Sequence, residues 1–237
     1  MQTKFLGAET IAEGTMLFKF EKPAGFTYKS GQSIDLILID PSETDAEGNS
    51  RAFSLVSTPA DEYLAIATRM RDTAFKRVLK NLASGTEVNL EGPFGDMTLH
   101  ENEKRSAVLL AGGIGITPFY SMAVDAAARK LPHKIVLMFS NRRPEDTAFL
   151  DDLTRLHEQN SNFTFVGTMT DMESSVQEWK GERGYINADM LKKYVDQTSM
   201  PIYYIAGPAG MVAALRKVLT ENGVSNDDIR AEEFTGY

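Results

Sequence analysis

The sequence contains no cysteine among its 237 residues. This absence excludes disulfides, thiolate nucleophiles and cysteine-ligated iron–sulfur clusters within the chain. Histidine is also scarce, because the sequence holds only His100, His133 and His157. Their wide separation argues against a zinc site, so we expect no metal.

Long hydrophobic runs and excess positive charge are missing as well. The N-terminal segment has no apolar core of a signal peptide, and no run approaches transmembrane length. We therefore expect a cytoplasmic protein without membrane insertion. The formal net charge of -8 argues against a general nucleic-acid binder, which needs a basic face. Hydrophobic residues at 42% and charged residues at 24% are typical of a globular protein.

The first hundred residues have the pattern of short strands separated by turns. Segments rich in β-branched and aromatic residues alternate with Gly, Pro, Asn and Ser. These segments are 15–20, 33–39, 52–57, 63–69 and 87–90. One helix follows Asp72 or Thr73, where apolar residues recur at helical spacing. The pattern predicts a small antiparallel barrel.

From about Arg105 the pattern changes to strand, turn and helix in repetition. Apolar strands are predicted at 108–111, 135–139, 163–170 and 202–206, with helices between them. Such alternation predicts crossover connections and a parallel sheet, because parallel strands need a long return path. The charged segment 100–106 is the expected domain junction.

The turn GGIGITP, from Gly112 to Pro118, follows an apolar strand and opens a helix. Thr117 is expected as the N-cap, with Pro118 in the first turn. Glycines and free N–H groups at a helix start suit a pyrophosphate. The turn departs from the usual dinucleotide fingerprint, because Pro118 stands where a third glycine would be. A phosphate-binding turn and a tight strand–helix connection therefore both remain open.

Two further loops are expected at the same edge of the sheet. IAGPAGM, from Ile205 to Met211, also joins a strand to a helix, and ligands of open α/β sheets bind at this edge. The loop after the second strand begins Ser140, Asn141 and Arg142 without a carboxylate. An arginine suits the 2′-phosphate of NADPH, so this loop favours NADPH over NADH. An ordinary solvated loop is the alternative.

In the barrel half, RAFS places Arg51 and Phe53 on one face of a strand and Ser54 on the other. Arg69 and Arg71 come just before the start of the expected helix. They fit either a second anion site or a solvated strand end.

The ordered set RAFS, GPFG, GGIGITP, SNR, AGPAGM and the terminal EEFTGY resembles the ferredoxin–NADP reductase superfamily. The resemblance covers nearly the whole chain. It implies an N-terminal antiparallel Greek-key β-barrel that binds flavin, residues 1–101, and a C-terminal Rossmann-like parallel α/β domain that binds NAD(P), residues 102–237. The implied activity is hydride transfer between NADPH and bound FAD, with electrons exchanged with a separate carrier such as ferredoxin or flavodoxin. The alternatives are a free-flavin reductase and a non-catalytic electron-transfer or regulatory subunit.

The resemblance also implies roles for single residues. Arg51 would hold the flavin pyrophosphate, Phe53 would pack against the flavin, and Ser54 would place its hydroxyl near flavin N5. Phe234 or Tyr237 would cover the flavin ring. The other flavin-binding residues would be Ala52, Thr68, Arg69, Met70, Arg71 and Thr73. The NADP-binding residues would be Gly112, Gly113, Ile114, Gly115, Thr117, Ser140, Asn141, Arg142, Ala206, Gly207, Pro208 and Met211.

Three positions depart from the family pattern. Phe53 replaces the more usual Tyr and so lacks a hydroxyl donor. Ala206 stands where the family commonly has Cys beside the nicotinamide, which implies slower or differently positioned hydride transfer. The helix start DTAF lacks the family's extra glycine, so FMN is the alternative to FAD.

Overall fold

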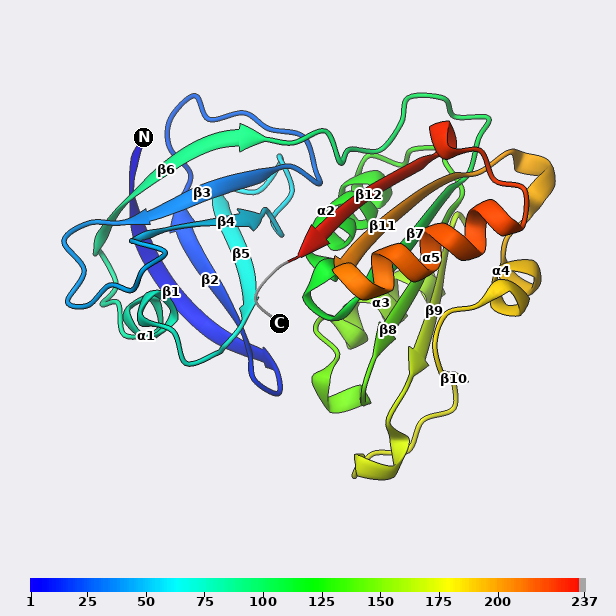
Figure 1. Cartoon of the computed structure of the whole chain (residues 1–237). Coiled ribbons are helices and arrows are strands. Elements are labelled where there is room, and N and C mark those ends of the chain that lie inside the picture. The colour runs from blue at the N-terminus through cyan, green and yellow to red at the C-terminus, as the bar shows by residue number, and fades with distance from the viewer. Residues whose placement is uncertain (235–237) are drawn as a thin grey trace.

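The computed structural model describes residues 1–234, which form two six-stranded sheets side by side (Figure 1). The first sheet is antiparallel, with the strand order β4-β3-β6-β1-β2-β5. An isolated bridge between Leu55 and Ile66 joins the two ends of this sheet, so it curls into a barrel. Its elements are β1 (Gln2–Ala12), β2 (Thr15–Glu21), β3 (Ser33–Leu38), β4 (Ser50–Ser54), β5 (Tyr63–Arg69), α1 (Ala74–Lys80) and β6 (Glu87–Phe94).

The barrel encloses an apolar core built from alternate residues of its strands. Phe18, Phe20, Ile34 and Leu36 are fully buried, as expected where every second side chain points inward. Strand β1 was not predicted. Its exposed residues include the apolar Leu6 and Ala8, and a register shift at Gly7 interrupts its alternation, so its pattern is too weak to indicate a strand.

The second sheet is parallel, with the strand order β10-β9-β8-β7-β11-β12. Residues of β7 that point one way pack against α2 and α3, and those that point the other way pack against α4 and α5. Its strands are β7 (Ala107–Gly112), β8 (Ile135–Asn141), β9 (Phe163–Met169), β10 (Glu182–Arg183), β11 (Ile202–Pro208) and β12 (Ile229–Phe234). Its helices are η1 (Gly113–Gly115), α2 (Ile116–Ala128), η2 (Pro144–Asp146), α3 (Leu150–Gln159), η3 (Met172–Ser174), α4 (Ala188–Tyr194), η4 (Gln197–Ser199), α5 (Ala209–Glu221) and η5 (Asn226–Asp228).

The predicted fold class is confirmed: an antiparallel Greek-key barrel is followed by a Rossmann-like parallel α/β domain. One local expectation was wrong. Thr117 is not the N-cap of α2, because the 3-10 turn η1 moves the cap to Gly115. Phe234 is the last residue of β12 and pairs with Pro208 of β11. Tyr237 lies outside the described residues.

The two domains share a continuous interface. Residues 95–106 connect β6 to β7, and the expected boundary at 101/102 falls within this connection. Leu17 and Val56 of the barrel belong to the same buried cluster as Phe119 of α2. The Ser121 hydroxyl also donates a buried hydrogen bond to the Ser57 carbonyl, 2.7 Å away.

Within residues 1–234, none of the helices combines the length and the apolar character that crossing a bilayer demands.

Candidate functional site

A cavity of about 640 Å³ lies where the carboxyl ends of β7, β8 and β11 face the barrel. The glycine turn, the loop after β8 and the start of α5 contribute to its wall, as the parallel topology requires. The barrel adds Arg69 and Arg71 from the end of β5. Of the sequence-predicted residues, the cavity is lined by Arg69, Arg71, Gly112, Gly113, Ser140, Asn141, Arg142, Pro208 and Met211.

The glycines of the first turn serve two different purposes. Gly113 has a φ of +52°, which a residue with a side chain rarely adopts, and it opens η1 at the cavity wall. Gly115 faces away from the cavity, and a Cβ there would lie 2.3 Å from the Ala206 carbonyl oxygen. Gly115 is therefore needed to pack the turn against β11. The tight-connection interpretation explains Gly115, whereas Gly113 lies at the wall of the cavity.

We expect Gly115→Ala to lower the free energy of unfolding by about 1–3 kcal/mol, the usual cost of overpacking a tight core. The clash is with backbone of β11, which cannot move aside as a flexible side chain can. Gly210→Ala is the matched control, since a Cβ there would meet no atom within 4 Å. It lies in α5, where alanine is favoured by up to about 1 kcal/mol. Urea unfolding of both variants checks this, and equal effects would contradict the packing role of Gly115.

Asn141, the last residue of β8, carries a buried amide without a partner. Its side-chain oxygen and nitrogen form no hydrogen bond within the described part of the chain, although the residue is 5% exposed and lines the cavity. An unsatisfied buried polar group costs about 1–3 kcal/mol. Such a group at a cavity wall indicates that a polar ligand completes its hydrogen bonds.

Arg142 lies at the rim of the cavity with most of its side chain in solvent. Its guanidinium is 2.7 Å from a carboxylate oxygen of Asp171, which follows β9. The hydrogen bond from Arg142 lowers the pKa of Asp171 below its ordinary value. The Arg142 guanidinium, which was predicted to bind a 2′-phosphate, is therefore already paired with a carboxylate. No local pattern in the sequence links Asp171 to Arg142.

The far wall of the cavity is apolar and was not predicted. Met211 is accompanied by Leu215 and Val218 of α5, and Tyr185 extends from the loop after β10. The Tyr185 side chain is 78% exposed, unusual for an aromatic residue. These residues form a surface on which a flat ring can lie. An isolated Tyr in a polar loop carries no local signal of this position.

The flavin-related residues gather where β4 packs against α1. The rings of Phe53 and Phe75 lie 6.0 Å apart, and the Arg51 guanidinium lies 5.1 Å from the centre of the Phe75 ring. Arg51 and Phe53 thus share one face of β4, and Ser54 is buried on the other, as the alternation predicts. Ala52 is exposed.

Arg51 forms ion pairs and hydrogen bonds with an acidic loop, residues 41–49. The sequence analysis did not predict this contact. One guanidinium nitrogen lies 2.9 Å from Asp45 and 3.0 Å from Glu47. The other donates to backbone carbonyls of this loop. Burial opposes ionisation of Asp45, yet its pKa lies below the ordinary value because Arg51 and the N–H groups of Glu47 and Ala74 bind the carboxylate. The Asp45 carboxylate thus bridges Arg51 and the start of α1.

Positive charge is concentrated at the start of α1. Thr73 is the N-cap, and its hydroxyl accepts a hydrogen bond from the N–H of Lys76. Burial lowers the pKa of Lys76, and Arg71 and Arg51 lower it further. The contributions of Arg71 and Arg51 mean that these cations repel Lys76, and a bound anion would relieve the repulsion. Here Asp45 and Glu47 supply part of that negative charge.

Several of the other sequence-predicted residues are buried or form hydrogen bonds within the fold. The Thr117 hydroxyl donates to the carbonyl of Ile114, Ala206 is fully buried behind the glycine turn, and Gly207 is buried at the end of β11. Thr68 is buried in β5, and the N–H of Met70 donates to Gly14.

Strand β12 brings two more side chains to the barrel-facing edge. Phe234 is half-buried against the interdomain core. Glu232 pairs in register with Ala206 on β11. Burial raises the pKa of Glu232 above its ordinary value, with a smaller contribution from Asp96. Sequence reasoning missed Glu232, because nothing in EEFTGY indicates a strand beside β11.

Comparisons with known proteins agree with this arrangement. Residues 109–217 match the family described as oxidoreductase NAD-binding domain. The chain is 28% identical over 229 residues to the glycine betaine monooxygenase reductase subunit of Chromohalobacter salexigens, covering 95% of this chain and 61% of that protein. The chain thus spans less than two thirds of this relative.

Two solved structures share the whole fold. The cytochrome P450 reductase GcoB of Amycolatopsis matches with a TM-score of 0.83 and 23% identity, over 100% of this chain and 70% of that one. The ferredoxin NADP+ reductase of Neisseria gonorrhoeae, with bound FAD and NADP, matches with a TM-score of 0.78 and 21% identity, over 98% of both chains.

Proposed function

We propose that this chain is a member of the ferredoxin–NADP reductase superfamily, and that it transfers hydride between NAD(P)H and a bound flavin and exchanges the electrons with a separate carrier. The observation that carries the proposal is the 640 Å³ cavity, in which the unpaired Asn141 amide and the glycine turn face two arginines of the barrel. A nucleotide and a second anionic cofactor would meet there.

The residues of the cavity fit a nicotinamide dinucleotide. Gly112 and Gly113 leave room for a pyrophosphate close to the backbone at the start of η1 and α2. Asn141 would complete its hydrogen bonds with polar groups of the ribose or phosphate. The adenine would lie on the apolar wall beside Tyr185, and the nicotinamide would lie toward Pro208. In this arrangement Tyr185 and Pro208 would hold the two ends of the coenzyme, with the reactive ring toward the barrel.

The residues on β4 and α1 fit a flavin. Arg51, Arg71 and Lys76 surround a position that favours phosphate, and Phe53 offers a ring for the flavin to pack against. A bound FAD would accept hydride at N5 and release electrons singly to another carrier. The buried Ser54 hydroxyl would lie toward N5 and hold it by a hydrogen bond. Phe234 would shield the ring from water.

An absorption spectrum of the purified protein tests the proposal. Bound flavin is expected as visible bands that bleach when NADPH is added without oxygen. A yellow protein that neither NADPH nor NADH bleaches would contradict hydride transfer and favour a non-catalytic subunit.

A free-flavin reductase is the second candidate, and one observation favours it. Asp45 and Glu47 occupy the donors of Arg51, so a flavin phosphate must compete with them. A protein that is colourless after purification, yet oxidises NADPH when free flavin is supplied, would support this candidate over a tightly bound FAD.

The partner is proposed as a small one-electron carrier such as ferredoxin or flavodoxin. The chain has no cysteine to ligate an iron–sulfur cluster, so single electrons must pass to another centre. The relative from Chromohalobacter salexigens is a glycine betaine monooxygenase reductase subunit, and this similarity supports a role for the chain in passing electrons to another protein. Reduction of added ferredoxin or flavodoxin by NADPH and the chain tests this partner.

For the coenzyme, we expect kcat/KM to be higher for NADPH than for NADH. Arg142→Ala should narrow the difference by roughly 1–3 kcal/mol, because its guanidinium would pair with the 2′-phosphate. Asp171→Asn should widen it, because the change removes the carboxylate that competes for Arg142. Steady-state kinetics with both coenzymes measure this. Equal efficiency in the parent protein would remove the 2′-phosphate role from this loop.

A further inference from the structure

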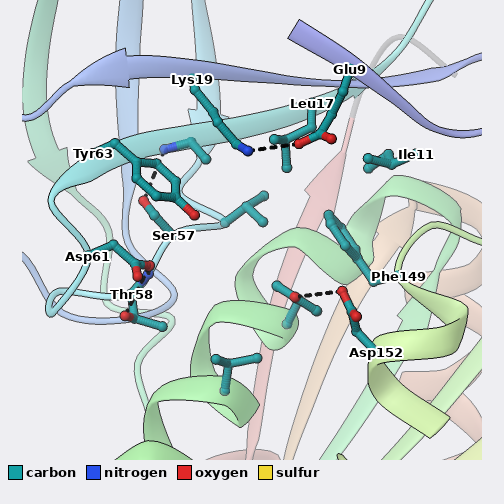
Figure 2. A pocket seen from close by; sticks show the side chains of 14 residues that line it. Glu9, Ile11, Leu17, Lys19, Ser57, Thr58, Asp61, Tyr63, Phe149 and Asp152 are labelled. Atoms are coloured by element: carbon teal, nitrogen blue, oxygen red, sulfur yellow. Dashed lines mark hydrogen bonds and ion pairs between the residues drawn. The ribbon is translucent and has the colours of Figure 1, made fainter. Parts of the chain in front are cut away.

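A second cavity, of about 330 Å³, lies between the domains, away from the proposed nucleotide and flavin residues (Figure 2). Strands β1, β2 and β5 form one wall, and helices α2 and α3 form the other. Among residues 1–234, none of those assigned above to the nucleotide or the flavin lines this cavity. Its volume, at the lower end for ligand sites, admits one small molecule of one or two rings.

Part of the inner surface of this cavity is apolar and aromatic. Leu17 and Ala65 of the barrel are buried along it, and Phe149 meets them from the start of α3. Phe149 has a φ of +61°, a conformation that bulky residues avoid and that is often retained at functional sites. Its ring is stacked on that of Tyr120, with 4.1 Å between the centres. The cavity therefore offers rigid aromatic surface to an apolar body.

The rim carries an excess of negative charge. Its carboxylates are Glu9, Asp61 and Asp152, and Lys19 is the one basic residue among the described residues that line the cavity. Lys19 is already paired with Glu9, 2.8 Å away. Figure 2 shows Asp61 and Asp152 on opposite sides of the opening, one from each domain.

Both opposed carboxylates keep capacity for a further partner. One oxygen of Asp61 accepts hydrogen bonds from the N–H and the hydroxyl of Thr58, at 2.7 and 3.1 Å. Its other oxygen has no hydrogen bond within residues 1–234. Asp152 accepts from the Tyr120 hydroxyl at 3.1 Å, and its other oxygen has only the exposed Arg155 at 3.4 Å.

The negative charge of the cavity affects the ionisation of Tyr120. Burial raises the pKa of Tyr120, and Asp152 raises it further, with smaller contributions from Tyr63 and Asp61. An additional anion would be repelled by the same groups, whereas a cation would be attracted.

We infer that this cavity binds a small organic cation, an ammonium group carried on an aromatic or hydrocarbon body. The ammonium would lie between Asp61 and Asp152, close to the face of Tyr63. That ring already has a cation near it, since the Lys19 nitrogen lies 5.4 Å from its centre. The apolar body would pack against Leu17 and Phe149. Because the two carboxylates belong to different domains, the ligand would also hold the domains together.

Isothermal titration calorimetry with phenethylammonium chloride tests the inference on the purified full chain without NAD(P)H. Phenylacetate has the same ring with the opposite charge and serves as the comparison ligand. We expect phenethylammonium to bind and to raise the melting temperature, and phenylacetate to do neither. Asp61→Asn and Asp152→Asn should each weaken binding by about tenfold or more, as expected for losing a charged hydrogen-bond acceptor.

Asp151→Asn is the matched control, because it removes the same charge from the neighbouring position of α3, and Asp151 does not line this cavity. It should leave affinity within about twofold. The amide oxygen introduced by Asp61→Asn can still accept from Thr58, and Asp152 is exposed, so both variants should fold. The inference is overturned by equal binding of phenylacetate, by unchanged affinity in both variants, or by no binding up to about 10 mM. None of these outcomes bears on hydride transfer, which is measured separately.

Discussion

Replacing Ser54 with alanine is expected to slow reduction of the bound flavin by NADPH by about 100-fold, the usual cost of losing one preorganised hydrogen-bond donor. The residue is 4% exposed at the end of β4, next to the domain interface. None of the hydrogen bonds within residues 1–234 involves its hydroxyl, so that group is available to a ligand. Anaerobic stopped-flow absorbance measures the rate.

The Ser54 prediction separates catalysis from binding. Flavin content and the dissociation constant for NADPH should stay close to those of the parent, because phosphate contacts and the cavity at β7 are unchanged. Ser50→Ala on the same strand is the matched control and should leave the rate within about twofold, since an isolated surface change has little effect. An unchanged rate in Ser54→Ala would leave this hydroxyl without a catalytic role.

Much of the fold could be predicted because its signals are local. The buried strand 108–111 and the glycine turn after it lie within a dozen residues of each other, and the structure places them as β7 and η1. Strand alternation also placed Arg51 and Phe53 on one face correctly. Period and turn chemistry are properties of neighbouring residues, so a single sequence displays them.

The features that could not be predicted depend on contacts between distant segments. Strand β12 forms because residues 229–234 pair with the edge of β11. No local pattern in EEFTGY indicates this pairing. Tyr185 and Arg142 line the same cavity although more than forty residues separate them. The neutralisation of Arg142 by Asp171 likewise requires β8 and β9 to be adjacent. Such pairings are set by topology.

The loop 41–49 shows the same limit at the proposed flavin site. By composition this acidic loop is an ordinary surface connection. In the structure its carboxylates form ion pairs with both Arg51 of β4 and Arg77 in the last turn of α1, so the loop connects these two elements. The role of Arg51 therefore depends on a competition that the motif RAFS does not reveal.

Removing Arg51 and removing the carboxylates that compete with the flavin phosphate for Arg51 are expected to change flavin affinity in opposite directions. Arg51→Ala should weaken flavin binding by roughly 10- to 150-fold, the equivalent of a lost hydrogen bond to a charged group of about 1.5–3 kcal/mol. The loss has a second cause. Once Arg51 is removed, Asp45 and Glu47 lose the cation that neutralises them, and they would repel the flavin phosphate at close range.

The double variant Asp45→Asn and Glu47→Gln should tighten flavin binding, because it keeps Arg51 and removes the groups that compete for its donors. Glu62→Gln, outside the loop, is the control for the charge change. Flavin fluorescence titration of apoprotein measures the affinity of all three variants at one ionic strength.

If Arg51→Ala retains flavin through dialysis, the assignment of Arg51 to the phosphate is wrong. If instead the double variant loses flavin along with Arg51→Ala, the acidic loop acts as a lid that stabilises bound flavin, and its ion pairs with Arg51 are part of the site. If Arg51→Ala weakens flavin binding and the double variant tightens it, the loop carboxylates and the flavin phosphate exclude one another from Arg51. Flavin can then bind only when the loop releases Arg51.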